Sequence, residues 1–295
     1  MSTTSVNARE ITTTPRKSDL LFRGVLTSMS MSSLVILTLI GGFLAFRGFE
    51  SFKTQGLHFI TQWDWSAAQD SSMKDSFGLG AMIIGTLVIA AVALTIGVPI
   101  SVLTALYLTE IKGNFAGVVR FFVQAMSGVP SIVAGLFIYA VWMIQLGNKY
   151  SNIAGAASLA ILMIPTVART SEEVLKLIPN DLREAGVALG GTQWRTVAMV
   201  VVPAARSGIL TAIILGVARV AGETAPLILT ILGNTETRVN PANVPMAALP
   251  LYTFNLMKTG LNVAISRAWG GALILLILVL ILFIAARLLG GRKRG

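Results

Sequence analysis

Long apolar stretches, separated by short polar ones, run along the whole chain. A helix needs about 20 mostly apolar residues to cross about 30 Å of hydrocarbon. Stretches of that kind lie at 24–46, 76–109, 121–148, 150–168, 207–235 and 268–286. The pattern predicts six membrane spans, which we place at about 24–46, 80–106, 123–146, 151–168, 208–233 and 268–287. We therefore expect an all-α membrane protein with a single transmembrane domain over 23–290, preceded by a tail over 1–22 and followed by a basic tail over 291–295.

Lys and Arg gather on one side of these six spans. With the N-terminus inside, 15 of the 23 basic residues fall in inner tails and loops, 7 fall in outer loops, and Arg219 falls within a span. An excess of Lys and Arg marks the cytoplasmic side of membrane proteins. We therefore expect both termini in the cytoplasm. The same placement accounts for the net charge of +10, so we expect membrane lipid as a partner and no nucleic acid.

The composition excludes several kinds of chemistry. Only 12% of the residues are charged, about half the share that is usual in soluble domains. Cysteine is absent, which excludes disulfides and thiolate metal sites. No G-x-x-x-x-G-K-[ST] loop occurs to hold a nucleotide phosphate, and Glu172 and Glu173 are adjacent, which suits solvent rather than an acid–base pair. We expect no catalytic residue, metal or cofactor in this chain.

The longest inner polar segment, 169–206, contains a short predicted helix. Asp181 and Glu184 have the spacing of a capping box, in which two side chains satisfy free amides at a helix start. Gly190, with a second glycine after it, ends the helix, because glycine readily adopts the left-handed conformation. The helix between these signals is about two turns long, too short to be stable in water without packing partners.

One face of this short helix is apolar. Leu182, Ala185 and Leu189 lie at positions i, i+3 and i+7, which share one side of a helix. Spacing alone leaves two interpretations open: a short helix that rests on the membrane face of its own domain, or a helix that docks in a groove of another protein.

The residues that follow favour docking. "EAGVALG" followed by "VVVP" resembles the EAA motif of the permeases of ABC importers, with Glu184, Ala185, Gly190 and Pro203 at the motif's spacings. Gly186 stands where the motif has its second alanine, and we expect it to add flexibility to the helix. The resemblance implies that this helix, with Asp181, Leu182 and Leu189, seats in a cleft of an ATPase subunit.

A narrower resemblance covers most of the chain. "SGVPSIVAGLF", "MIPTVARTSEEVLKLIPNDLREAGVALG" and "ARVAGETAPLILT" are similar to the A-type permease subunit of the phosphate-specific ABC importer. The resemblance implies the MetI-like fold of type I importers, in a bacterial cell membrane. It also implies a second, related permease as heterodimer partner, two ATPase subunits that bind ATP, and an extracytoplasmic phosphate-binding protein.

Two charges interrupt the fifth span. If that span enters the hydrocarbon near residue 208, Arg219 lies roughly 17 Å deep, close to the midplane. A charge there costs about 2.5–3.5 kcal/mol on insertion scales. Glu223 is one turn further on, so the two side chains are expected to meet as an i, i+4 pair.

Two interpretations of this pair remain open. It is either an ion pair that fixes helix packing or partner register, or part of an anion path. In the second case the planar guanidinium of Arg219 binds phosphate oxygens, and Glu223 holds Arg219 while no substrate is present. The resemblance implies transport roles for both residues. Arg169, at the inner end of span four, is either an anchor to lipid headgroups or an exit-side contact for the anion.

These features lead to one function and three alternatives. The expected function is that of a permease subunit which forms, with its partner, the path for inorganic phosphate in an ATP-driven importer. A permease for another oxyanion, such as sulfate or molybdate, explains the same features. A standalone ion-coupled carrier needs no docking helix, and a membrane scaffold does not need Arg219.

Overall fold

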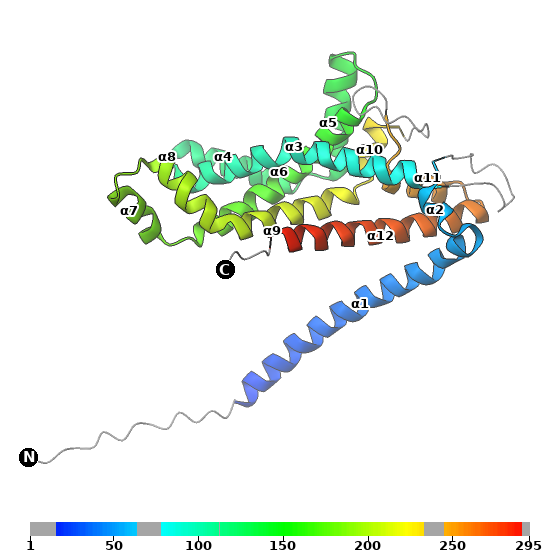
Figure 1. Ribbon diagram of the computed structural model, residues 1–295, viewed down its shortest axis with the longest axis horizontal. Helices are drawn as coiled ribbons and strands as arrows, with labels where there is room; N and C mark the ends of the chain where they lie inside the picture. The colour runs from blue at the N-terminus through cyan, green and yellow to red at the C-terminus, as the bar shows by residue number, and fades with distance from the viewer. Residues whose placement is uncertain (1–15, 64–77, 112, 233–244, 291–295) are drawn as a thin grey trace, which may run out of the picture. The chain divides into compact units, whose positions relative to one another are not determined.

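A computed structural model describes residues 16–63, 78–111, 113–232 and 245–290, and within these ranges every regular element is a helix (Figure 1). In chain order the helices are α1 Lys17–Gln55, α2 His58–Thr61, α3 Gly80–Glu110, α4 Asn114–Ser127, α5 Ser131–Ile138, η1 Tyr139–Gln145, α6 Asn152–Lys176, α7 Asn180–Ala188, α8 Gln193–Thr196, η2 Val197–Val201, α9 Val202–Ala221, α10 Ala225–Thr230, α11 Leu249–Lys258 and α12 Asn262–Gly290. The all-α prediction is confirmed.

The helix that contains the first predicted span is longer than expected. Helix α1 begins at Lys17, so residues 17–22, expected in a tail, are helical. The remainder of that tail and the basic tail 291–295 lie outside the described residues. From Leu20 to Phe46 nearly all the large apolar side chains of α1 are exposed, as expected of a helix surrounded by lipid. Residues up to Ala45 form a unit of their own, and the helices described below belong to the second unit, which begins at Phe46.

Five helical segments in the described ranges are long and apolar enough to cross a membrane, and a bent pair makes up to six. The bent pair is α4 with the run Ser131–Gln145, and its axes differ by 106°. The segment predicted as a span at 123–146 is therefore sharply bent. The bend lies at Gly128 to Pro130, because proline lacks a backbone donor and disfavours helical geometry in the residue before it.

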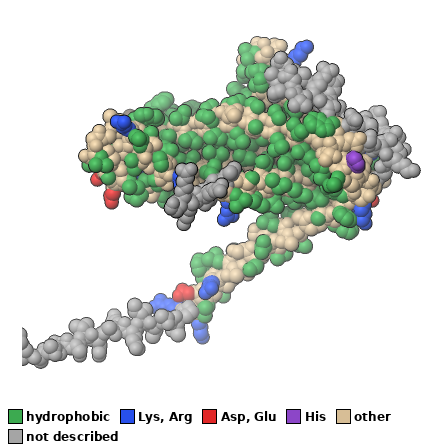
Figure 2. All heavy atoms as spheres, viewed as in Figure 1, with side chains coloured by type: hydrophobic (Ala, Val, Ile, Leu, Met, Phe, Trp, Pro, Cys, Tyr) green, Lys and Arg blue, Asp and Glu red, His purple; other side chains and the backbone are tan. Residues whose placement is uncertain are grey.

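Helix α6 is central to the second unit, where it packs against α3, α4, α5 and α9. Small residues permit these close approaches: a Cβ atom at Gly97 of α3 would lie 2.4 Å from Met163 Cε, and one at Gly216 of α9 would lie 2.4 Å from Val167 Cγ2. Such packing is typical of helices in membranes, where lipid removes most of the hydrophobic driving force. Figure 2 shows that apolar side chains cover most of the visible face of these helices.

The inner loop is shorter than the predicted 169–206. Helix α6 continues to Lys176, because Ser171 and Leu175 are buried against neighbouring helices. From Gln193 the chain is helical through α8, η2 and α9 to Ala221. The connection between these long helices is therefore residues 177–192, and α7 lies within it.

The fifth span, predicted as one helix over 208–233, is broken. Helix α9 ends at Ala221, and α10 begins at Ala225, with Pro226 in its first turn. Part of the segment between the fifth and sixth predicted spans is also helical, because α11 contributes buried side chains such as Leu251 and Tyr252 to the core.

Candidate functional site

The short helix predicted in the inner loop exists as α7. Its start differs from the prediction: Pro179 occupies the N-cap, no side chain caps the free amides, and Asp181 lies in the first turn. The capping box of Asp181 and Glu184 is therefore wrong, although a carboxylate in the first turn still complements the helix dipole. The predicted stop is confirmed, because Gly190 adopts the left-handed conformation with φ +82°.

The predicted apolar face of α7 is open to its surroundings. Leu189 is 90% exposed and Leu182 is 41% exposed, and Ala185 and Glu184 are exposed as well. The nearby Leu177 and Trp194 are 80% and 68% exposed. A helix this short, with its leucines unburied, presents a surface suited to a partner protein rather than one packed on its own domain.

Gly186 has a packing role. A Cβ atom at this position would lie 2.5 Å from Thr196 Cγ2 and 2.9 Å from Thr196 Oγ1. The amide of Gly191 donates a hydrogen bond to the carbonyl of Gly186 over 3.2 Å. Gly186 therefore allows α7 to lie directly against α8, which changes the interpretation of this residue from a source of flexibility to a point of close contact.

Pro203 lies in the first turn of α9, directly after the π-helical turn η2. Proline cannot donate the backbone hydrogen bond that an α-helix would require there. The wider η2 turn accommodates this missing donor and lets the helix continue from α8 into the long α9.

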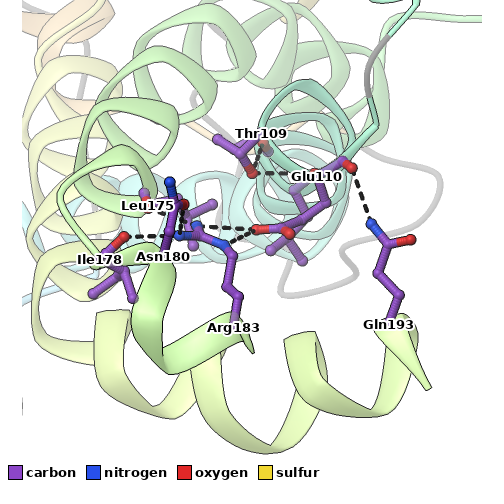
Figure 3. A network of polar contacts seen from close by, with 9 residues as sticks. Thr109, Glu110, Leu175, Ile178, Asn180, Arg183 and Gln193 are labelled. Carbon is purple, nitrogen blue, oxygen red and sulfur yellow. Dashed lines mark hydrogen bonds and ion pairs between the residues drawn. The ribbon is translucent and has the colours of Figure 1, made fainter. Parts of the chain in front are cut away.

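Three residues near α7 were not singled out from the sequence. Arg183 of α7 donates to Glu110 Oε1, at the end of α3, from Nε over 3.2 Å and from Nη2 over 3.1 Å (Figure 3). Gln193 Nε2 donates to the carbonyl of Glu110 over 3.2 Å. Glu110 is the only acidic residue between 76 and 120, and this isolation at the end of an apolar run was the available signal.

Glu172 was expected to suit solvent, and that expectation is wrong. Its side chain is 4% exposed and forms ion pairs with Arg120 Nη2 over 2.9 Å and with Lys176 Nζ over 3.0 Å. It also accepts a hydrogen bond from Arg120 Nε over 3.0 Å. Arg120 also donates to the carbonyl of Leu108 over 3.1 Å. Glu172 thus ties α6 to α4, while the adjacent Glu173, with its side chain 70% exposed, has the solvent-facing position expected.

The expected pairing of Arg219 with Glu223 is wrong. Arg219 lies in the last turn of α9, and Glu223 lies beyond the end of that helix. Among the described residues, neither side chain forms an ion pair. Arg219 is exposed and Glu223 is half-buried, while the neighbouring Val220 is part of the apolar core. The guanidinium is available to a ligand or to a partner chain in this arrangement.

Arg169 is exposed on α6, seven residues before the end of that helix, and forms no ion pair among the described residues. The choice between a lipid anchor and an anion contact stays open. In the same described part of the chain, no three His, Asp or Glu side chains gather in a way that could hold a metal ion.

Comparison with known proteins identifies the family. Residues 97–295 match the model of the binding-protein-dependent transport system inner membrane component. The chain belongs to this family. It is a multi-pass inner membrane protein and a permease-type transport component.

Relatives with similar sequences have a common description. The chain is 38% identical to the phosphate transport system permease protein PstA 1 of Mycobacterium tuberculosis over 228 residues, which are 76% of this chain and 75% of the relative. It is 41% identical to the phosphate transport system permease protein PstA of Pasteurella multocida over 218 residues, 73% and 77% of the two chains.

Solved structures of ABC transporters share the fold. A chain of a bacterial alginate ABC transporter in complex with its periplasmic protein superposes with a TM-score of 0.61 at 16% identity, covering 92% of this chain and 97% of that one. A chain of the MetNI methionine ABC transporter gives a TM-score of 0.58 at 20% identity, covering 72% and 93%. The MetI-like fold of the prediction is confirmed.

Proposed function

We propose that this chain is a permease subunit of an ATP-driven importer and forms, with a second related permease, the path for inorganic phosphate. The observation that carries the proposal is that the apolar face of α7 is exposed while Arg219, also exposed, has no ion-pair partner among the described residues. A docking helix allows a separate ATPase subunit to drive transport, and a guanidinium is well suited to bind an oxyanion. The names of the relatives favour phosphate among oxyanions.

The partners follow from the same features. Two ATPase subunits at the cytoplasmic face would take up α7 and would bind and hydrolyse ATP, so this chain supplies no catalytic residue and no cofactor. An extracytoplasmic phosphate-binding protein would deliver the substrate, and lipid would surround the exposed apolar helices. Arg219 would face the partner permease across the path, which accounts for its exposure in the single chain.

The chemistry of passage needs a site that attracts the anion without trapping it. The guanidinium of Arg219 can donate two parallel hydrogen bonds to phosphate oxygens. Glu223, four residues away, adds a negative charge near the path, which weakens phosphate binding and so favours release. In this account Arg219 and Glu223 act on the substrate separately rather than as a closed pair.

The test is uptake of labelled phosphate by proteoliposomes that contain the chain, its partner permease, the ATPases and internal ATP. We expect uptake that requires ATP and the binding protein, and that excess unlabelled phosphate suppresses. Suppression by sulfate or molybdate instead would assign another oxyanion. Uptake that needs no ATP and stops when ion gradients are dissipated would indicate a standalone carrier.

A further inference from the structure

A hollow of about 650 Å³ lies between the end of α3 and the pair of helices α7 and α8. Glu110, Glu184, Gln193 and Thr196 are among the residues that line it. Helix α7 packs on α8 and η2, but this hollow separates it from α3. A movement of α7 can therefore reach α3 through the polar contacts that bridge the hollow more readily than through apolar packing.

The main bridge is the ion pair between Arg183 and Glu110. Both Nε and Nη2 of Arg183 donate to the same oxygen, Glu110 Oε1, over 3.2 and 3.1 Å. The side chains are only 22% and 12% exposed. A partly shielded pair of this kind is weakened less by solvent and salt than a surface pair, so it can hold two helices at a fixed separation.

Arg183 is itself held in place from α6. Its Nη1 donates to the carbonyl of Ile178 over 2.7 Å and its Nη2 to the carbonyl of Leu175 over 3.1 Å (Figure 3). These carbonyls lie at the end of α6 and just beyond it, where backbone acceptors lack partners within the helix. The rigid fork of the guanidinium therefore joins the ends of α3 and α6 to α7 at a single point.

A second bridge reaches Glu110 from the other side of α7. Gln193, the first residue of α8, donates from Nε2 to the carbonyl of Glu110 over 3.2 Å. Because Gly186 brings α7 directly against Thr196 of α8, the two short helices form one packed element. Glu110 is thus bonded both to α7, through Arg183, and to the first residue of α8, through Gln193.

Helix α3 connects Glu110 with the Arg219 region, by which we mean the end of α9 and the apolar cluster around Val220. It has 31 residues, so it is about 46 Å long. Toward its other end, Thr86 Oγ1 accepts a hydrogen bond from the amide of Leu249 over 2.8 Å. The neighbouring Ala248 belongs to the same apolar cluster as Val220, which adjoins Arg219.

We infer that Glu110 and Arg183 are positioning residues that transmit the movement of α7 to α3, and through α3 to the Arg219 region. The inference rests on the proposed function, in which the ATPases move α7. Without the pair, α7 can still dock on an ATPase, because its exposed leucines are unchanged, but its displacement is absorbed in the hollow. We therefore expect a complex without this ion pair to hydrolyse ATP but to transport less phosphate for each ATP hydrolysed.

The test uses the complete complex in proteoliposomes with Glu110→Gln, which keeps the size of the side chain and removes its charge. Glu173→Gln, a nearby exposed carboxylate, is the matched control. We expect Glu110→Gln to lower the ratio of phosphate transported to ATP hydrolysed roughly 2- to 30-fold, the range of measured coupling effects. ATPase co-purification should not change. An unchanged ratio in Glu110→Gln overturns the inference.

A double variant shows whether Glu110 and Arg183 act together as an ion pair or independently of each other. If Glu110 and Arg183 act as one unit, adding Arg183→Gln to Glu110→Gln lowers the ratio little further than either change alone. Independent, multiplying losses contradict the inference.

A distance measurement covers the case in which a variant fails to assemble. The chain has no cysteine, so spin labels can be placed at Ile111→Cys and Leu189→Cys, which are 51% and 90% exposed. In the full chain in detergent we expect a narrow distance distribution that broadens with Glu110→Gln and not with Glu173→Gln. An equal width in both overturns the inference. If the unaltered complex fails to import phosphate, the proposed function fails, and this distance test still reports on the ion pair.

Discussion

Arg183 and Arg219 differ in exposure and in the number of hydrogen-bond partners of their guanidinium groups. Arg183 is 22% exposed and its guanidinium donates to Glu110 and to the carbonyls of Leu175 and Ile178. Arg219 is exposed at the end of α9, and it forms no ion pair with Glu223 or with any other described residue. A guanidinium has five N–H donors. Where the protein fills them, the residue is structural, and where it leaves them open, the residue can take a ligand.

The same contrast distinguishes the carboxylates. Glu110 and Glu172 are shielded and paired with arginines, whereas Glu223 lies beyond a helix end and forms no ion pair among the described residues. Sequence spacing suggested the opposite, because Arg219 and Glu223 are four residues apart and Glu110 and Arg183 are 73 apart. Proximity in space, and not in sequence, decides which charges neutralise one another.

Among the variants that test this contrast between shielded and exposed residues, the largest effect is expected at the exposed surface of α7. Leu189→Asp places a charge on a 90% exposed leucine that the proposal buries in the ATPase. A buried anchor residue of an interface is worth about 2 kcal/mol or more, roughly 30-fold in affinity. We expect co-purification of the ATPase to be lost, while membrane abundance is unchanged.

Two controls accompany this measurement. Leu189→Met keeps the apolar contact and should retain the ATPase. Leu57→Asp introduces the same charge at a leucine that is 78% exposed between α1 and α2, and it too should retain the ATPase. Normal ATPase recovery with Leu189→Asp would exclude α7 as the docking helix.

A smaller effect is expected from filling the close contact between α3 and the segment just before α11. A Cβ atom at Gly85 of α3 would lie 2.0 Å from the carbonyl oxygen of Ala247, which cannot move independently of its backbone. Gly85→Ala should destabilise the chain by about 1–3 kcal/mol, seen as a lower midpoint of thermal unfolding in detergent. Gly117→Ala in α4 meets no atom within 4 Å and should be neutral or slightly stabilising. Equal midpoints would contradict this close contact of α3 with the backbone of Ala247.

The adjacent glutamates provide a finer comparison. Glu172→Gln removes the charge opposite Arg120 and Lys176 but keeps the shape and some hydrogen bonds, so we expect a loss of about 1 kcal/mol. Glu173→Gln changes an exposed carboxylate and should cost less than that. Thermal unfolding of the two variants, side by side, measures the difference. Equal loss in both would mean that the contact between α4 and α6 does not depend on this ion pair.

A small effect is also expected at Arg169. If this exposed arginine anchors α6 to lipid headgroups, Arg169→Ala removes about 1 kcal/mol of membrane attraction and should lower phosphate uptake no more than a few-fold. Arg169→Lys should behave as wild type, because either charge binds headgroups. A loss as large as that of an essential path residue, with Arg169→Lys also inactive, would instead favour the exit-side anion contact.

The sequence predicted the helical class, most spans and the position of α7, because these depend on local hydropathy and on glycine signals such as Gly190. It failed where tertiary contacts override local pattern. Helix α6, for example, extends past Arg169, where Glu172 is neutralised by a residue 52 positions away.

The candidate site shows the same division. The motif residues from Glu184 to Pro203 were found because they are close in sequence. Glu110 and Gln193 were missed because their partners come from distant segments. The helix end after Ala221 was missed because Gly222 and Pro226 lie in an otherwise apolar run, and hydropathy alone does not register a break.

The central claim is that the open guanidinium of Arg219 contacts phosphate during transport. The most direct measurement is ATP-driven uptake of labelled phosphate by the complete complex with Arg219→Ala, beside Arg206→Ala, an exposed arginine of the same helix. Loss of a charged contact to the anion costs about 2–5 kcal/mol, so we expect uptake to fall roughly 30-fold or more with Arg219→Ala at unchanged assembly. Uptake equal to that of Arg206→Ala and wild type would contradict the claim.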